Sequence, residues 1–259
     1  MIYPVISLPY IMAFLTILVR VIGIFTTAPI LGTKIIPNIA KVGLGLFLSY
    51  MIFSITPNQI NYFRELHFLT YSILLISETI IGILLGFVAS LIFNAIQFGG
   101  RLIDISMGMH IASVVDPLSS EQQSLVGQFQ YILCILFFLS MNGHHLILTA
   151  LLKSFSITPI GTLTFTASFA NTLMQIITTS FIIGIQLAGP VVATLFLVDF
   201  SLGIIAKGVP QMNVFLTGMP LKSLVGFLIV FATFPFYHSF FKAVPALMYE
   251  QIIAILKVI

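Results

Sequence analysis

Arg20 and Glu78 are the charged residues that lie deepest within apolar stretches of this 259-residue chain. A charge inside a membrane is costly, so such residues are by default functional candidates that need a partner. Three interpretations are open for them. They could form a buried structural ion pair, the guanidinium could reach a polar surface or channel, or the two could take part in a proton relay.

The other reactive residue types form no pattern of a catalytic or metal site. His144 and His145 are adjacent, and neighbouring side chains of a helix do not face each other, so the two cannot share a metal as an i, i+4 pair can. Cys134 is the only cysteine and lies in the apolar stretch YILCILFFL, which predicts a buried, inert thiol. Asp104 and Asp116, in a polar stretch, are weak indications of acid–base catalysis. We therefore expect no enzyme activity, no metal and no cofactor.

The composition indicates a membrane protein. Hydrophobic residues make up 59% of the chain, charged residues only 7%, and the mean hydropathy is +1.17. Soluble domains carry about a quarter of charged residues. The basic residues are scattered singly, which argues against a nucleic-acid partner. Because no hydrophilic block is long enough to fold separately, we expect residues 1–259 to form a single domain.

Long apolar runs must position the charged residues. A hydrocarbon core of about 30 Å needs about 20 apolar residues of helix, and runs of this length suit helices better than barrel strands. We therefore expect an all-α, integral membrane-type fold of helical hairpins, with about six long hydrophobic helices, some of them kinked. The expected spans are Leu8–Ala28, Ala40–Ile55, Phe68–Phe98, Leu125–Leu152, Leu173–Phe200 and Leu221–Phe241, followed by an amphipathic tail from Pro245 to Ile259.

Two features complicate a simple six-helix bundle. Phe68–Phe98 would be about 46 Å long as a helix, well beyond the hydrocarbon thickness. Lysine and arginine divide almost evenly between the two sides of six alternating spans, so they predict no orientation. Within the runs, Gly82 and Gly86 have a GxxxG spacing, which either lets helices approach closely or reflects the frequency of glycine in membrane helices. Gly189–Pro190 is expected to bend or break the fifth run.

A polar stretch of about 25 residues, GGRLIDISMGMHIASVVDPLSSEQQ, separates two of the most hydrophobic runs. Loops of this length are usually functional or disordered. Its glycines allow unusual turns, its methionines are flexible apolar fillers, and Asp116–Pro117 favours a turn. Asp104 is interpreted as a loop charge of little energetic weight. A disordered linker is the alternative to a functional loop.

Eight motifs follow one another along nearly the whole chain: LVRVIGIFTTAPILGTKIIP, ETIIGILLGF, QFGGRLIDISMG, VVDP, NGHHLIL, SFSITPIG, AGPVVATLFLVDFSLGIIAK and VPQMNVFLTGMPLKSLVG. In this order they resemble the FliR family of flagellar type III export gates and the related injectisome subunit. The last motif is the most specific, because a set of its residues matches the family at fixed spacing. That set is Pro210, Gln211, Asn213, Phe215, Gly218, Pro220 and Lys222.

The resemblance implies a non-enzymatic subunit of the flagellar export gate, in the bacterial inner (cytoplasmic) membrane at the basal body. It implies assembly with FliP and FliQ, with FlhB and FlhA nearby, and passage of unfolded flagellar proteins, in contact with membrane lipid. Partner subunits would then cover the overlong apolar runs. The alternatives are the equivalent subunit of a virulence injectisome, a polytopic membrane transporter and an intramembrane enzyme.

The resemblance also implies roles for particular residues. The central loop, residues 99–124, would project into the export channel and help to plug it. The expected plug residues are Met107, Gly108, Met109, Ile111, Val114, Val115, Asp116 and Pro117. The residues expected in helix packing or assembly are Arg20, Glu78, Gly82, Gly86, Gly100, Asp104, Pro210, Gln211, Asn213, Phe215, Gly218, Pro220 and Lys222.

Overall fold

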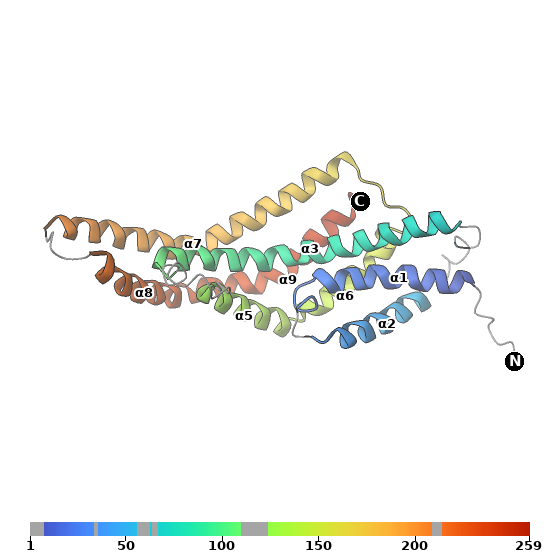
Figure 1. Ribbon diagram of the computed structural model, residues 1–259, viewed down its shortest axis with the longest axis horizontal. Coiled ribbons are helices and arrows are strands. Elements are labelled where there is room, and N and C mark those ends of the chain that lie inside the picture. The colour runs from blue at the N-terminus through green and yellow to red at the C-terminus, as the bar shows by residue number, and fades with distance from the viewer. Residues whose placement is uncertain (1–7, 34–35, 56–62, 64–66, 110–123, 209–213) are drawn as a thin grey trace. The chain divides into compact units, whose positions relative to one another are not determined.

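The computed structural model describes the chain except residues 1–7, 34–35, 56–62, 64–66, 110–123 and 209–213, and for residues 214–217 it describes the backbone alone. Helices dominate the described ranges, which contain no β-strand (Figure 1). The helices are α1 (Leu8–Thr27), α2 (Asn38–Ile55), α3 (Phe68–Met107), α5 (Leu125–Ser140), α6 (Gly143–Ile157), α7 (Ala167–Gly208), α8 (Val214–Ala232) and α9 (Phe234–Leu256). The expected all-α fold is confirmed.

Five of the described helices, α1, α2, α3, α7 and α9, are long and apolar enough to cross a membrane. The pair α5 and α6, bent by 70° at its break, makes a sixth candidate span if it is counted as one. The prediction of about six long, kinked hydrophobic helices is therefore confirmed. At 40 and 42 residues, α3 and α7 are about 60 Å long, roughly twice the thickness of a hydrocarbon core.

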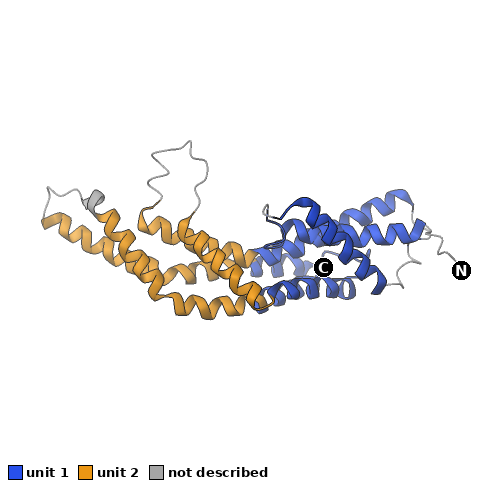
Figure 2. Cartoon of the chain, turned by 90° about the horizontal axis from the view of Figure 1, so that it is seen from below, with its two compact units in different colours: residues 1–90, 143–176, 246–259 blue, residues 91–142, 177–245 orange. Residues whose placement is uncertain are grey.

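The chain forms two compact units, each built from segments that are far apart in the sequence (Figure 2). Unit 1 comprises Met1–Ser90, Gly143–Ile176 and Ala246–Ile259, and unit 2 comprises Leu91–Asn142 and Ile177–Pro245. In unit 1, Ile24 of α1, Leu85 of α3, Leu151 of α6 and Ile252 of α9 line one internal void of about 10 Å³. Four helices therefore share a closely packed core in this unit.

Unit 2 has an aromatic core of its own. The ring of Phe93 in α3 meets the rings of Tyr131 and Phe138 in α5 edge-on, with centroids 6.2 and 5.3 Å apart. From α9, the hydroxyl of the buried Tyr237 donates a hydrogen bond of 3.2 Å to the carbonyl oxygen of Leu187 in α7. This partner is needed because a buried tyrosine hydroxyl without a hydrogen bond would be destabilising.

Two spans that the sequence predicts as continuous are divided in the structure. The run Leu125–Leu152 breaks after Ser140, because Asn142 adopts a left-handed conformation with φ of 57°, which asparagine tolerates better than most residues. The run Leu221–Phe241 breaks at Thr233. Pro235 then lies in the first turn of α9, where its missing N–H costs no helical hydrogen bond.

Prolines inside α7 and α9 do not end these helices. α7 continues through Pro190, so of the two outcomes expected for Gly189–Pro190, a bend or a break, the break does not occur. Val191 and Leu195, which follow in the same helix, are fully buried, and this packing offsets the loss of one backbone donor. α9 likewise continues through Pro245, where the sequence suggests the start of a separate tail.

Candidate functional site

A buried ion pair joins α1 to α3 in unit 1. The Nε of Arg20 donates a hydrogen bond of 2.5 Å to Oε2 of Glu78, and both side chains are fully buried. The structure thus brings together the two charges that lie deepest in the apolar runs. Their geometry is that of a buried structural ion pair, the first of the three interpretations. A paired guanidinium and carboxylate stabilise each other where neither could remain charged alone.

Further groups complete the hydrogen bonding of this pair. Arg20 Nη1 donates to Ser154 Oγ of α6 at 3.2 Å, and both Nη atoms donate to the carbonyl oxygen of Thr158 at 3.1 Å. The guanidinium carbon lies 4.2 Å from the ring centroid of Phe155. The backbone N–H of Gly161 donates to Glu78 Oε1 at 3.1 Å. The pair therefore ties together α1, α3, α6 and the turn that follows α6.

Glycines place α1 and α3 in backbone contact beside the ion pair. Glu78, Gly82 and Gly86 are spaced by four residues and so share one face of α3. A Cβ atom on Gly82 would overlap the carbonyl oxygen of Arg20, and one on Gly86 would overlap Oγ1 of Thr27. This close approach brings the carboxylate of Glu78 within reach of Arg20.

The two ends of the central stretch are joined in unit 2. Asp104 Oδ2 accepts a hydrogen bond of 2.5 Å from Ser124 Oγ, and the N–H of Val126 lies 3.3 Å from both carboxylate oxygens. Ser124 is also the N-cap of α5 and accepts a hydrogen bond of 2.8 Å from the N–H of Gly127. These bonds hold the end of α3 against the start of α5.

Asp104 thus corrects an expectation. The sequence suggests a loop that begins at Gly99 and contains Asp104 as an exposed charge. In the structure α3 continues to Met107 because Ile103 and Met107, four residues apart, both bury their side chains. Asp104 is 3% exposed and belongs to the helix, so the part of the stretch outside the helices begins at Gly108.

Close packing accompanies these hydrogen bonds. A Cβ on Gly100 would overlap the backbone of Gly127, so α3 and α5 touch at their main chains. Met107 is fully buried and packs against Gly226 of α8. The chain leaves α3 at Gly108 with φ of 79°, a conformation that favours glycine. We call Gly100, Asp104, Ser124 and Gly127 the loop anchor.

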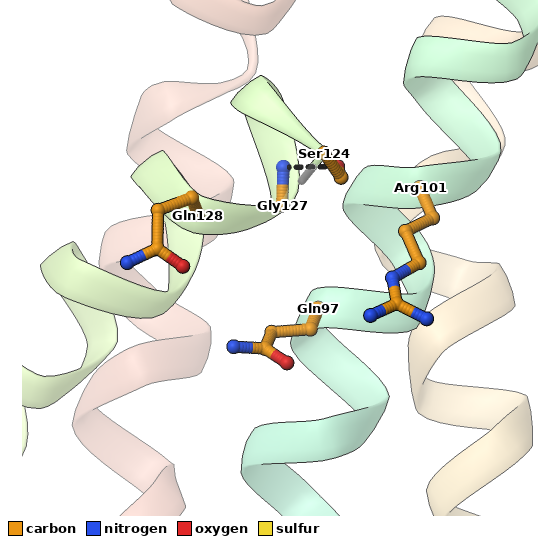
Figure 3. A pocket seen from close by; sticks show the side chains of 5 residues that line it. All are labelled: Gln97, Arg101, Ser124, Gly127 and Gln128. Atoms are coloured by element: carbon orange, nitrogen blue, oxygen red, sulfur yellow. Dashed lines mark hydrogen bonds between the residues drawn. The ribbon is translucent and has the colours of Figure 1, made fainter. Parts of the chain in front are cut away.

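A polar cavity of about 220 Å³ lies beside the loop anchor. It is lined by Gln97 and Arg101 of α3 and by Ser124, Gly127 and Gln128 of α5 (Figure 3). Gln97 and Arg101 are four residues apart and therefore lie on one face of α3. Figure 3 shows the amide groups of Gln97 and Gln128 in the space between the two helices, with the Arg101 side chain on the α3 side.

Lys222 forms an ion pair with a residue outside the last motif. Its ammonium group pairs with the carboxylate of Asp199, which links α8 to α7 within unit 2. Gly218, one turn earlier in α8, lies against Leu202 of α7, and Pro220 lies inside α8. The described part of the last motif therefore forms one side of an α7–α8 contact.

The remaining predicted site residues fall in two groups. Gly108 and Met109 are described, and the N–H of Met109 donates to the carbonyl oxygen of Asp104 at 3.1 Å. Phe215 belongs to α8, but its side chain is not described. The other predicted residues lie outside the described residues: Ile111, Val114, Val115, Asp116, Pro117, Pro210, Gln211 and Asn213.

Some of the missed residues had a detectable signal. A serine directly before an apolar run, as in SLVGQF, is typical of a helix N-cap and could have identified Ser124. Gly127 has no spacing motif, and Ser154 and Thr158 look like ordinary helix-end residues. The described residues contain no group of three or more His, Cys, Asp or Glu placed to hold a metal ion, and Cys134 is buried.

The fold and these contacts define a helical protein with several candidate membrane spans, in which residues on either side of the central segment, residues 108–123, are joined by hydrogen bonds. Comparison of the sequence with known proteins identifies its family. Residues 11–247 match the family described as Bacterial export proteins, family 1. The flagellar biosynthetic protein FliR of Bacillus subtilis is 37% identical over 221 residues, 84% of each chain.

Two other relatives are, by name, a flagellar biosynthetic protein and a translocation protein. The FliR protein of Escherichia coli is 30% identical over 224 residues, 86% of this chain and 84% of the relative. The Yop proteins translocation protein T of Yersinia pestis is 28% identical over 221 residues, 83% of this chain and 82% of the relative. The chain therefore belongs to bacterial export protein family 1, the family of the FliR proteins, and the resemblance inferred from the eight motifs is confirmed.

Proposed function

We propose that this chain is a subunit of the flagellar type III export gate, which with FliP and FliQ forms the channel through which unfolded flagellar proteins are secreted. Membership of the FliR family and the five or six candidate spans support this role. The gate lies in the bacterial inner membrane at the flagellar basal body, beside FlhA and FlhB. The subunit acts through its surfaces and its central segment, and performs no catalysis itself.

The central segment, residues 108–123, is proposed to close the channel at rest. The loop anchor carries this proposal, because Asp104 accepts hydrogen bonds from Ser124 Oγ and from the N–H of Val126, which hold both ends of the segment at one place. A segment tethered in this way can fill a channel and withdraw without disturbing the helices that carry it. Met109, Ile111, Val114 and Val115 would supply the apolar filling. Met107 packs on Gly226 and so contributes to holding the segment in place.

Deletion of residues 110–120 tests the plug. The deletion keeps the loop anchor and Met107, and because Met109 lies close to Asp104, a short Gly-Ser linker can close the gap to Ser124. The gate should still assemble, while membrane conductance and entry of small solutes should rise. A variant with Ser119→Ala and Ser120→Ala is the control and should leave the membrane tight. Normal conductance in an assembled deletion variant would refute the plug.

The choice between a flagellar and an injectisome gate can be tested by complementation. Identity to the FliR proteins of Bacillus subtilis and Escherichia coli, at 37% and 30%, exceeds the 28% identity to the Yersinia pestis translocation protein, although the FliR proteins of Buchnera aphidicola are 26–28% identical. We therefore expect the chain to restore swimming to a bacterium that lacks its own FliR, when FliP and FliQ from the same source are supplied with it. Restored secretion through an injectisome, without restored swimming, would favour the virulence system.

A further inference from the structure

We infer that the polar cavity beside the loop anchor binds carboxylate side chains of the unfolded polypeptide that passes through the gate. The inference rests on the proposed function, because an exported polypeptide that moves past the central segment also passes the loop anchor, beside which the cavity lies. The ligand class is an extended acidic peptide. Arg101 supplies the charge, and the amides of Gln97 and Gln128 supply the neutral hydrogen-bonding groups.

Among the described residues of unit 2, Arg101 has no counter-ion. The described residues of this unit contain two carboxylates, Asp104 and Asp199. Asp104 is bound to Ser124 and Val126, and Asp199 is paired with Lys222. Arg101 forms neither an ion pair nor a hydrogen bond with any described residue, although it lines a cavity. Arg101 is therefore available to an anion from outside these described residues.

The chemistry of the lining suits a polypeptide. A guanidinium presents several N–H donors in a planar fork, which matches the two oxygens of a carboxylate. Each glutamine amide offers both donors and an acceptor, so Gln97 and Gln128 can pair with the exposed N–H and C=O groups of an unfolded backbone whatever its sequence. The cavity, at about 220 Å³, is large enough for one side chain with its peptide group and too small for a folded domain.

Weak binding is what a transport path requires. Arg101 is exposed to solvent, so an ion pair formed there is screened and worth little. A site that bound the cargo tightly would arrest it, whereas a weak site lets the chain enter and leave again. The cavity therefore gives acidic segments a modest advantage in passage and does not decide whether export occurs.

The test uses two secreted reporters that differ only in one linker, which is rich in Asp and Glu in the first and in Asn and Gln in the second. Both are expressed in cells whose export gate contains this chain. Arg101→Gln should lower secretion of the acidic reporter about two- to fivefold relative to the neutral one, the size expected of a solvent-exposed ion pair. Arg101→Glu should lower it further and favour a third reporter whose linker is rich in lysine.

Lys242→Gln is the matched control, because Lys242 is another exposed cation of unit 2 outside the cavity. It should leave the ratio of the two reporters unchanged. An equal loss of both reporters in Arg101→Gln, or the same shift in Lys242→Gln, would overturn the inference. The same shift in a double variant with Asp116→Asn and Glu121→Gln would also overturn the inference. It would show that Arg101 pairs with a carboxylate of this chain and not with one of the exported polypeptide. If the unaltered chain secretes neither reporter, the proposed function itself fails.

Discussion

Arg20 and Glu78 show how a charged pair is tolerated in a core with few other polar groups. The guanidinium has three hydrogen-bonding partners from different parts of unit 1, and the carboxylate has two. Such a pair adds little net stability compared with apolar residues of the same size, but removing one partner leaves a buried charge alone. The effect of the Arg20–Glu78 pair on stability is therefore revealed when only one of its two residues is substituted.

Glu78→Leu should lower the free energy of unfolding by about 3–5 kcal/mol, because Arg20 would lose its counter-ion. The double variant Arg20→Met with Glu78→Leu should recover much of that loss. It should remain slightly below the unaltered protein, since Gly161 N–H and Thr158 C=O would each lose a hydrogen bond, whose net contribution is about 1 kcal/mol. Thermal unfolding of the assembled gate in detergent measures both effects. Additive losses in the double variant would contradict a direct pairing.

At the same scale, the sequence identified charges better than their partners. Arg20 and Glu78 stand out because charge is rare in long apolar runs, and this rarity is visible without a structure. Ser154 and Thr158 could not be predicted, because their role depends on where a turn of another helix lies. Asp104 was placed in a loop because polar neighbours conceal the buried Ile103 and Met107 on its helix.

At the scale of the elements, the close contact between α1 and α3 requires a residue without a Cβ at position 82, because there is no room for that atom. Gly82→Ala should destabilise the protein by about 1–3 kcal/mol, because the methyl group would overlap the carbonyl of Arg20 and push the two helices apart. Gly43→Ala in α2 is the matched control, since a Cβ there meets no atom within 4 Å and alanine favours helix. Thermal unfolding should distinguish the two, and equal stability would contradict the packing argument.

The loop anchor depends on a second such contact, between α3 and α5. Gly100→Ala should separate these helices and weaken the Asp104–Ser124 hydrogen bond, whereas Gly203→Ala, which meets no atom within 4 Å, should have no such effect. Limited proteolysis of the assembled gate measures the result. Cleavage within residues 108–123 should become faster in the first variant only, and unchanged cleavage in both would argue against the anchor.

Helix boundaries were predicted less well than helices. The apolar runs indicated most spans correctly because lipid-compatible backbone must be helical over about 20 residues. Pro190 does not end α7 and Pro245 does not begin a separate tail, since both helices continue through these prolines. The break at Asn142 was missed because a left-handed asparagine is a property of the local packing and not of the apolar pattern.

For the whole molecule, the exposed apolar surface is the main feature. Ile39 is 87% exposed, Phe68 is 82% and Leu69 is 76%, and many other large apolar side chains share this property. Apolar surface of this extent needs lipid or another protein. The composition predicts this need, but the arrangement of segments far apart in the chain into two units could not be derived from local patterns.

The chain expressed alone should therefore aggregate or remain unstable in mild detergent, whereas co-expression with FliP and FliQ should give a uniform complex. Size-exclusion chromatography with light scattering measures the difference. Co-expression with an unrelated membrane protein of similar hydropathy is the control and should not rescue the chain. A folded, uniform monomer in mild detergent would show that partners are not needed.

The loop anchor also sets a maximum reach for the segment that it holds. The sixteen residues 108–123 follow and precede residues that lie next to each other, so no point of the segment can be farther from the anchor than about half its contour length. At a contour length of about 3.3–3.6 Å per residue, its tip cannot extend more than about 30 Å from the anchor. A helical polypeptide with its side chains is only about 10–12 Å across. The tether is thus long enough to cross an aperture that admits one chain, and too short to obstruct a wide pore.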